Sequence, residues 1–214
     1  MLILAEEAAI LDARTEPGAG WSWLAEMCRP WSGCVEAALV GELLLRGRLA
    51  MSDGQVAVTD PTPLGHELLD EMLRNMARSR VRWGLHSWMA NVGRVLPRYV
   101  DRLAARLAAK HLVRWERLRW LGITWGERYW VEDRSARADV EDRLRTAVES
   151  AVHPDRRTAV LLAAGGHSRG VQAMFPGLPR AKPCARVRDY VRQDPIADAV
   201  WQARERAAAY MNSG

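Results

Sequence analysis

The sequence predicts a mainly α-helical domain that carries two small β-hairpins. Three observations support this fold class. Apolar residues recur at helical spacing through most of the chain, Gly and Pro interrupt them at short intervals, and only two segments have the composition of paired strands. With 214 residues, 49% hydrophobic and 27% charged, the chain has the size and composition of one soluble globular domain over residues 1–214. Collagen-like and disordered classes are excluded.

The first part of the chain predicts two helices and a hairpin. Helical periodicity covers Leu2–Asp12 and ends before the turn-rich stretch Thr15–Gly20. Gly33–Arg46 has few polar interruptions and is the strongest candidate for a core helix. Leu49–Asp60 alternates around a Ser-Asp-Gly sequence, in which Gly54 supplies the positive φ that a tight hairpin turn requires.

Three further helices are expected over Leu64–Arg78, Val81–Val95 and Pro97–His111. Arginines follow one another at four-residue steps through the last two segments, at Arg94, Arg98, Arg102 and Arg106. Such a row cannot lie in a core. It is either an ordinary solvated face or a surface that binds anions.

His111–Val131 is rich in Trp, Tyr, Val and Ile, contains two glycines and has no sustained helical stripe, so it predicts a β-hairpin with its tip near Leu121–Thr124. The rest of the chain predicts helices separated by Gly or Pro, over Ala136–Val152, Pro154–Ala164, Val171–Phe175, Pro183–Val191 and Pro195–Met211.

The second hairpin is the main candidate for a functional site, because a two-stranded ribbon cannot readily bury both faces and its tip within a monomer. One face is expected to pack on the helical core, and the other side chains to protrude or meet a partner. Each large apolar side chain entering a bilayer interface contributes roughly 1.5–3 kcal/mol before association costs, and each nearby Arg about 1 kcal/mol on an anionic leaflet. The expected membrane-inserting residues are Trp115, Trp120, Leu121, Ile123 and Trp125, with Arg117 and Arg119 beside them.

Charge and targeting signals favour a peripheral protein on the cytoplasmic face of a membrane. The net charge is +5, and all basic residues except Lys110 and Lys182 are Arg, which suits anionic partners. The N-terminal run lacks a basic n-region, and no stretch has the 18 uncharged apolar residues of a spanning helix. The three cysteines match no zinc framework or CxxC pair, so buried or idle thiols in a reducing compartment are expected.

Catalytic and metal motifs are weak. Gly166–Gly170 reads G-x-S-x-G, but a nucleophile elbow needs a preceding strand and a later His, and no histidine follows Ser168. The five histidines match no metal-ligand spacing. We therefore expect no catalytic residue, no metal and no cofactor.

A winged-helix DNA-binding protein is an alternative, because Gly33–Arg46, the hairpin around Gly54 and the helix from Leu64 follow one another in that order. The presumed recognition helix, however, carries Glu36 and Glu42, which would oppose phosphate binding. No nucleic-acid partner is therefore expected.

Several blocks of sequence resemble the Golgi phosphoprotein 3 family in its bacterial form. They are LAEEAAIL over Leu4–Leu11, ELLLRGRL over Glu42–Leu49, DPTPLGHELLDE over Asp60–Glu71, HPDRRTAVLLAA over His153–Ala164 and FPGL over Phe175–Leu178, together with the Trp-rich hairpin. The resemblance covers essentially the whole chain. It implies a compact domain around a central helical bundle, peripheral membrane attachment and no accepted catalytic activity.

In eukaryotic relatives, the resemblance implies a basic pocket for phosphatidylinositol 4-phosphate, an inserting hairpin, and adaptor contacts with the cytosolic tails of glycosyltransferases. Ungapped counting places the three pocket arginines of those relatives on Glu36, Pro97 and Val100, so all three charges are missing here. The nearest candidates for a headgroup site are Arg98, Arg102, Arg29 and Trp31.

Together these observations predict a non-enzymatic peripheral membrane protein that binds anionic, phosphoinositide-like headgroups through a basic surface and inserts an aromatic hairpin. A glycosyltransferase-like protein client is implied by the resemblance. The alternative from a different class is a cytosolic adaptor, or a self-associating protein that forms a homo-oligomer through the same hairpin.

Overall fold

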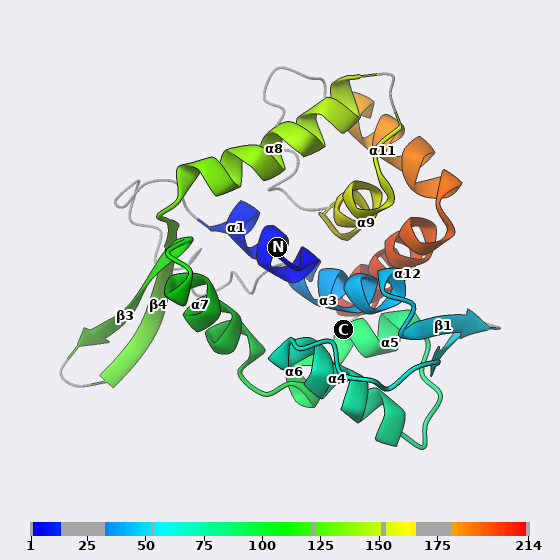
Figure 1. The fold of residues 1–214 in the computed structure, drawn as a ribbon, viewed down its shortest axis with the longest axis horizontal. Coiled ribbons are helices and arrows are strands. Elements are labelled where there is room, and N and C mark those ends of the chain that lie inside the picture. The colour runs from blue at the N-terminus through cyan, green and yellow to red at the C-terminus, as the bar shows by residue number, and fades with distance from the viewer. Residues whose placement is uncertain are drawn as a thin grey trace.

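The structure is a computed structural model that describes residues 2–13, 33–52, 54–120, 123–150, 153–165 and 181–212. Within these residues it contains ten helices and two separate two-stranded antiparallel sheets (Figure 1). The mainly helical fold with two small hairpins is confirmed.

Helix α3 (Cys34–Leu45) lies at the centre of the fold. Its sequence places apolar side chains on every face, so the helix is stable only when other elements surround it. Of the residues from Val35 to Leu44, all except Glu36 are buried. Helices α1 (Leu4–Asp12), α9 (Arg156–Gly165) and α12 (Pro195–Asn212) pack against it (Figure 1). The predicted core helix is confirmed.

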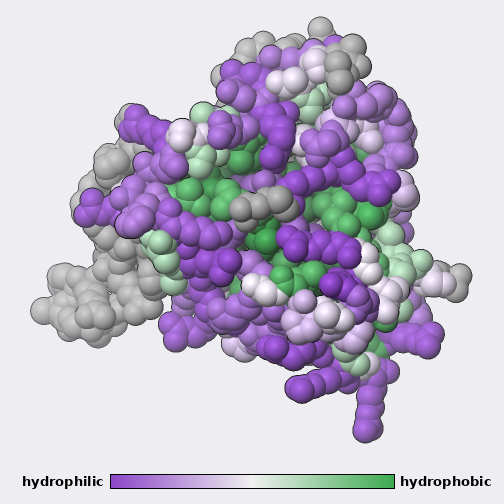
Figure 2. Space-filling view, in the orientation of Figure 1, coloured by the Kyte–Doolittle hydropathy of each residue, from purple (hydrophilic) through white to green (hydrophobic). Residues whose placement is uncertain are grey.

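The outer helices are α4 (Glu67–Arg78), α5 (Leu85–Ala90), α8 (Arg134–Glu149) and α11 (Ala181–Gln193). The long ones bury a single stripe; in α8 this stripe consists of Val140, Leu144, Ala147 and Val148. The apolar core is therefore enclosed by half-polar helices. Figure 2 shows the result, with hydrophilic side chains over most of the face and apolar residues seen between them near its middle.

The first hairpin pairs β1 (Leu49–Ser52) with β2 (Gln55–Val58), and Ser52 lies opposite Gln55. Gly54 has φ 73°, the left-handed conformation that the turn was expected to need. Leu49 and Val56 are buried, whereas Ala50 and Met51 are exposed. This hairpin is confirmed.

Two predicted helices differ from those in the structure. The helix expected over Val81–Val95 is divided into α5 and α6 (Val92–Val95) at Asn91, whose Nδ2 donates to the Ser87 carbonyl at 2.8 Å. The helix expected from Pro97 is α7 (Tyr99–Ala109), because Arg98 has φ 56° and lies outside helical backbone geometry.

Side-chain caps account for two further boundaries. Helix α4 begins at Glu67 rather than Leu64, since the carboxylate of Asp70 accepts hydrogen bonds from the Leu64 and Gly65 amides. Helix α8 begins earlier than Ala136, because the Asp133 side chain accepts from two amides of its first turn. The predicted loop Thr15–Gly20 and helix Val171–Phe175 lie outside the described residues.

Candidate functional site

The second hairpin joins the helical domain at its base. Strands β3 (Val113–Trp120) and β4 (Ile123–Val131) are antiparallel, with Val113 opposite Val131. Both valines are buried, and the Glu132 amide donates to the Leu112 carbonyl at 2.9 Å. Figure 1 shows the paired strands continuing past α7 and away from the other helices. The predicted hairpin is confirmed, and its position follows from this buried base.

The backbone places most of the expected membrane-inserting residues on this ribbon. Trp115, Arg117, Arg119 and Trp120 belong to β3, and Ile123 and Trp125 to β4. The pairing passes from Leu118 opposite Gly126 to Arg119 opposite Thr124, so Trp125 is bypassed at a bulge. Leu121, at the expected tip, lies outside the described residues.

One basic and aromatic pair is seen at the base of the ribbon. Arg114 is exposed, and its guanidinium carbon lies 5.9 Å from the centre of the half-buried Trp130 ring. A guanidinium over an indole face is a favourable cation–π arrangement. The alternation of Arg with Trp therefore produces a direct contact in this part of the hairpin.

The four arginines expected at four-residue steps do not form a row on one helix, so that part of the prediction is wrong. Arg94 belongs to α6, Arg98 precedes α7, and only Arg102 and Arg106 share α7. The left-handed φ of Arg98 changes the chain direction between the two helices.

Carboxylates neutralise the two arginines on α7. Arg102 lies 2.6 Å from both Glu67 and Glu71 of α4, and Arg106 lies 2.8 Å from Glu6 of α1. Partial burial acts to lower the pKa of Arg102, but its hydrogen bonds to Glu71 and Glu67 outweigh this and raise it. Arg102 is thus engaged by two protein carboxylates at the place where a headgroup contact was expected.

Arg98 differs, because 71% of its side chain is exposed and its carboxylate partner within the described ranges, Asp101, is a helix neighbour at 2.9 Å. Exposed pairs of this kind contribute little to stability. Of the two expected headgroup arginines in the described residues, Arg98 is the accessible one. Arg29 and Trp31 lie outside the described residues.

One position that the family resemblance assigns to a pocket arginine, Glu36, contacts a residue that lies between the other two in sequence. Glu36 of α3 accepts a hydrogen bond from the hydroxyl of Tyr99. Tyr99 directly precedes Val100, and Pro97 lies two residues before it in the sequence. Burial, together with the Glu36 carboxylate, raises the pKa of Tyr99. A carboxylate and a neutral phenol therefore occupy a place where a phosphate would need cations.

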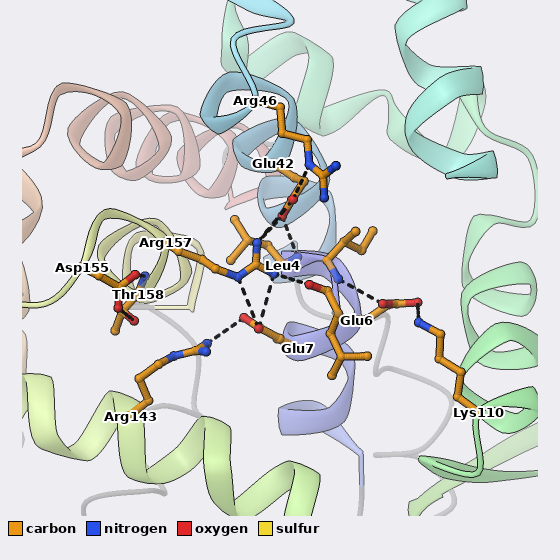
Figure 3. Close-up of polar contacts among 12 residues, drawn as sticks. Leu4, Glu6, Glu7, Glu42, Arg46, Lys110, Arg143, Asp155, Arg157 and Thr158 are labelled. Carbon is orange, nitrogen blue, oxygen red and sulfur yellow. Dashed lines mark hydrogen bonds and ion pairs between the residues drawn. The ribbon is translucent and has the colours of Figure 1, made fainter. Parts of the chain in front are cut away.

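A network of buried carboxylates lies between α1, α3 and α9 (Figure 3). Glu42 accepts from the Leu4 amide at 2.9 Å, from Arg46 at 2.7 Å and from Arg157 at 3.0 Å. Arg157 also donates to the Leu2 carbonyl at 2.6 Å and lies 3.4 Å from Glu7. This guanidinium joins all three helices.

Glu6 is fully buried and faces the other side of the network. Its Oε1 accepts from Arg106 at 2.8 Å and Lys110 at 2.7 Å, and its Oε2 accepts from the Ile3 amide at 3.0 Å. His66 Nε2 lies 3.9 Å away, beyond hydrogen-bond distance. Burial acts to raise the pKa of Glu6, but the neighbouring His66, Lys110, Ile3 amide and Arg106 lower it to about 2.

This network of buried charges was not predicted from the sequence, although the sequence carries a signal for it. Glu6, Glu7 and Glu42 each lie within an otherwise apolar helix, and Arg157 precedes an apolar run. A carboxylate in such a setting must be paired, because an unpaired buried charge is too costly. These residues belong to the sequence blocks that resemble the family, so those blocks specify the fold of the core.

The structure disagrees with the two alternatives that sequence motifs suggested, a hydrolase nucleophile elbow and a DNA-binding winged helix. The residues before the G-x-S-x-G sequence form helix α9 and not the strand that a nucleophile elbow requires, and Ser168 itself lies outside the described residues. Helix α3, the presumed recognition helix of a winged-helix protein, is enclosed by other helices. It is not available to enter a DNA groove.

The described residues thus form a helical domain built around a buried central helix, with a Trp- and Arg-rich hairpin joined to it at one edge. No helix in the described part of the chain is long and apolar enough to cross a bilayer. Likewise, no group of three His, Cys, Asp or Glu side chains that could hold a metal ion lies within the described ranges.

This chain belongs to the Golgi phosphoprotein 3 family. The family model described as Golgi phosphoprotein 3 (GPP34) matches residues 4–207. No curated protein matches the chain.

Proposed function

We propose that the protein is a non-enzymatic peripheral membrane protein on the cytoplasmic face of a membrane. In this proposal the β3–β4 hairpin inserts shallowly into the bilayer interface, and nearby arginines contact anionic headgroups. The observation that carries the proposal is the hairpin itself. Its base is anchored by the buried Val113 and Val131, and the strands beyond the base lead away from the helices (Figure 1).

The composition of the strands supports a lipid partner. Trp has an apolar body and one N–H group, which suits the boundary between headgroups and acyl chains. The strands also carry Arg114, Arg117, Arg119 and Arg128 among their aromatic residues. Arginine side chains suit anionic headgroups better than they suit a dry protein interface.

Specific recognition of phosphatidylinositol 4-phosphate is not part of the proposal. The Glu36 and Tyr99 pair stands where the resemblance implies a pocket arginine. A carboxylate at that place repels a phosphate, so we expect attraction to anionic lipids in general.

The experiment is vesicle flotation with Trp120, Leu121 and Ile123 changed together to Ser. We expect the wild-type protein to bind vesicles that contain phosphatidylserine and the triple variant to lose this binding. The melting temperature should change little, because side chains available to lipid contribute little to the folded state. Vesicle binding equal to that of the wild type would refute insertion of the hairpin.

A second candidate function is association with a protein through the same hairpin, either a client such as a glycosyltransferase tail or another copy of this chain. It is favoured by the topology, because β3 and β4 pair only with each other in the described part of the chain and leave outer edges that another strand can join. In that case the triple variant would lower the oligomeric state in sedimentation experiments and leave flotation unchanged.

A further inference from the structure

Apart from the β3–β4 hairpin, a second part of the chain carries several basic residues and no acidic residue. Residues 72–100 contain six arginines and neither Asp nor Glu. The segment runs from the middle of α4 through the connection to α5 and on to the start of α7. Since the whole chain has nearly balanced charge, with 31 basic and 26 acidic residues, an acid-free stretch of this length concentrates positive potential.

We call five of these arginines the basic face: Arg74, Arg78, Arg80, Arg82 and Arg94. All five are exposed. None of them forms an ion pair with a carboxylate among the residues that the structure describes. In this respect they differ from Arg98, Arg102 and Arg106, which all have carboxylate partners.

The nearest carboxylates along the chain are already engaged elsewhere. Glu67 and Glu71 pair with Arg102, Asp70 accepts from two backbone amides, and Asp101 pairs with Arg98. They are therefore poorly placed to compensate the basic face. Its charge is available to an external anion.

Two exposed apolar side chains lie beside this charge. Val81 is 56% exposed and Met51 is 39% exposed, and they are the exposed large hydrophobic residues among those whose side chains the structure describes. Ser79 fixes the loop that presents Val81, because its hydroxyl donates to the Val81 carbonyl at 2.9 Å. The loop also lies along the first hairpin, since the Val56 amide donates to the Trp83 carbonyl at 3.0 Å.

Apolar tips beside unpaired arginines fit a lipid interface better than a nucleic acid. Arg94 lies 5.0 Å from the centre of the Trp83 ring, and Trp88 packs against that ring at 4.8 Å. The Trp83 ring thus already contacts two protein groups, whereas single-stranded nucleic acids stack their bases on a free ring face. Phosphate contacts alone would also leave Val81 exposed to water.

We propose that the basic face, with Val81 at its tip, is a second contact with an anionic bilayer surface, separate from the β3–β4 hairpin. This inference rests on the proposed peripheral attachment. In Figure 1 the far end of the hairpin and the end of α4 both point toward the lower side of the molecule. Two contacts on one molecule strengthen attachment, because the second forms at high effective concentration once the first has formed.

The test changes Arg74, Arg78, Arg80 and Arg82 together to Gln. Its matched control changes Arg134, Arg145, Arg188 and Arg192 to Gln, which removes the same charge from exposed positions on α8 and α11 at the upper side of Figure 1. Binding is measured by flotation with phosphatidylcholine vesicles, with and without phosphatidylserine, at low and high ionic strength. A variant with Lys at the four tested positions keeps the charge and should bind as the wild type does.

We expect the basic-face variant to lose at least about tenfold in affinity for anionic vesicles at low salt, because each arginine near an anionic leaflet contributes about fivefold. The control should keep most of its affinity. Val81→Ser should weaken binding further without lowering the melting temperature, since the side chain is largely exposed. Equal vesicle affinity for the basic-face variant and its control would overturn the inference.

Two other outcomes are distinguishable. If the basic-face variant loses retention on immobilised DNA while its vesicle binding equals that of the control, the surface binds nucleic acid and the inference is wrong. If the hairpin variant binds vesicles normally but the basic-face variant does not, the proposed hairpin insertion fails and the basic face stands as the membrane contact.

Discussion

Replacing Glu6 by Gln tests whether the buried carboxylates stabilise the fold. Glu6 is fully buried and accepts from Arg106, Lys110 and the Ile3 amide. Its pKa falls from the ordinary 4.5 to about 2 in the folded protein. This difference corresponds to about 3 kcal/mol of stability at neutral pH. Gln keeps the shape of the side chain but removes the charge, so E6Q should lower the free energy of unfolding by about this amount.

The pH dependence of the unfolding free energy tests the role of the Glu6 charge more directly than a single measurement at neutral pH. Because the folded-state pKa of Glu6 lies below its unfolded value, its contribution is fully present above pH 4.5 and is lost as the pH falls toward 2. The difference in unfolding free energy between the wild type and E6Q should therefore shrink over that window. Urea denaturation at a series of pH values measures it.

A matched control is Glu149→Gln, which removes a carboxylate from an exposed position at the end of α8. This variant should unfold close to the wild type throughout, since exposed charges contribute little. A difference between the wild type and E6Q that stays constant from pH 5 to 2.5 would refute the argument that the Glu6 charge stabilises the folded state.

Two further predictions concern packing and chemistry. Gly41→Ala should lower the melting temperature even though Ala favours helices, because a Cβ at Gly41 would lie 2.7 Å from Cγ1 of Val160; a higher melting temperature would show that α3 and α9 can separate at little cost. The wild-type protein should show no esterase activity and no stoichiometric zinc, and esterase turnover that disappears in Ser168→Ala would contradict the non-enzymatic proposal.

The elements that could be predicted from sequence are those that local patterns determine. The apolar character of Gly33–Arg46 indicated a helix buried on all sides, and α3 is such a helix. The Ser-Asp-Gly turn and the Trp-rich segment predicted two hairpins, and both are present. In each case the signal lies within about 20 neighbouring residues, which is the range over which periodicity and turn chemistry act.

The neutralisation of the arginines could not be predicted in this way. Arg106 is 100 residues from Glu6 in sequence, and Arg102 is 31 residues from Glu71. Helical spacing places Arg102 and Arg106 on an accessible face but does not identify what packs against it. The break at Arg98 was missed for a related reason, since a left-handed φ at a non-Gly residue is imposed by the surrounding structure.

The arginines of this protein therefore fall into two groups, those paired with buried carboxylates and those that leave positive charge on the surface. The sequence alone does not show to which group an arginine belongs. Arg106, Arg143 and Arg157 pair with buried glutamates and hold α1 to α3, α7, α8 and α9. Removing one partner would leave a buried charge uncompensated, so these arginines cannot be released to a headgroup without loss of stability. The arginines of the basic face form no ion pair with a carboxylate among the described residues. Substituting them therefore alters the surface potential while the core stays intact. Under the proposed function, attraction to an anionic membrane without the family's pocket arginines comes from charge of this second kind, together with the arginines of the hairpin.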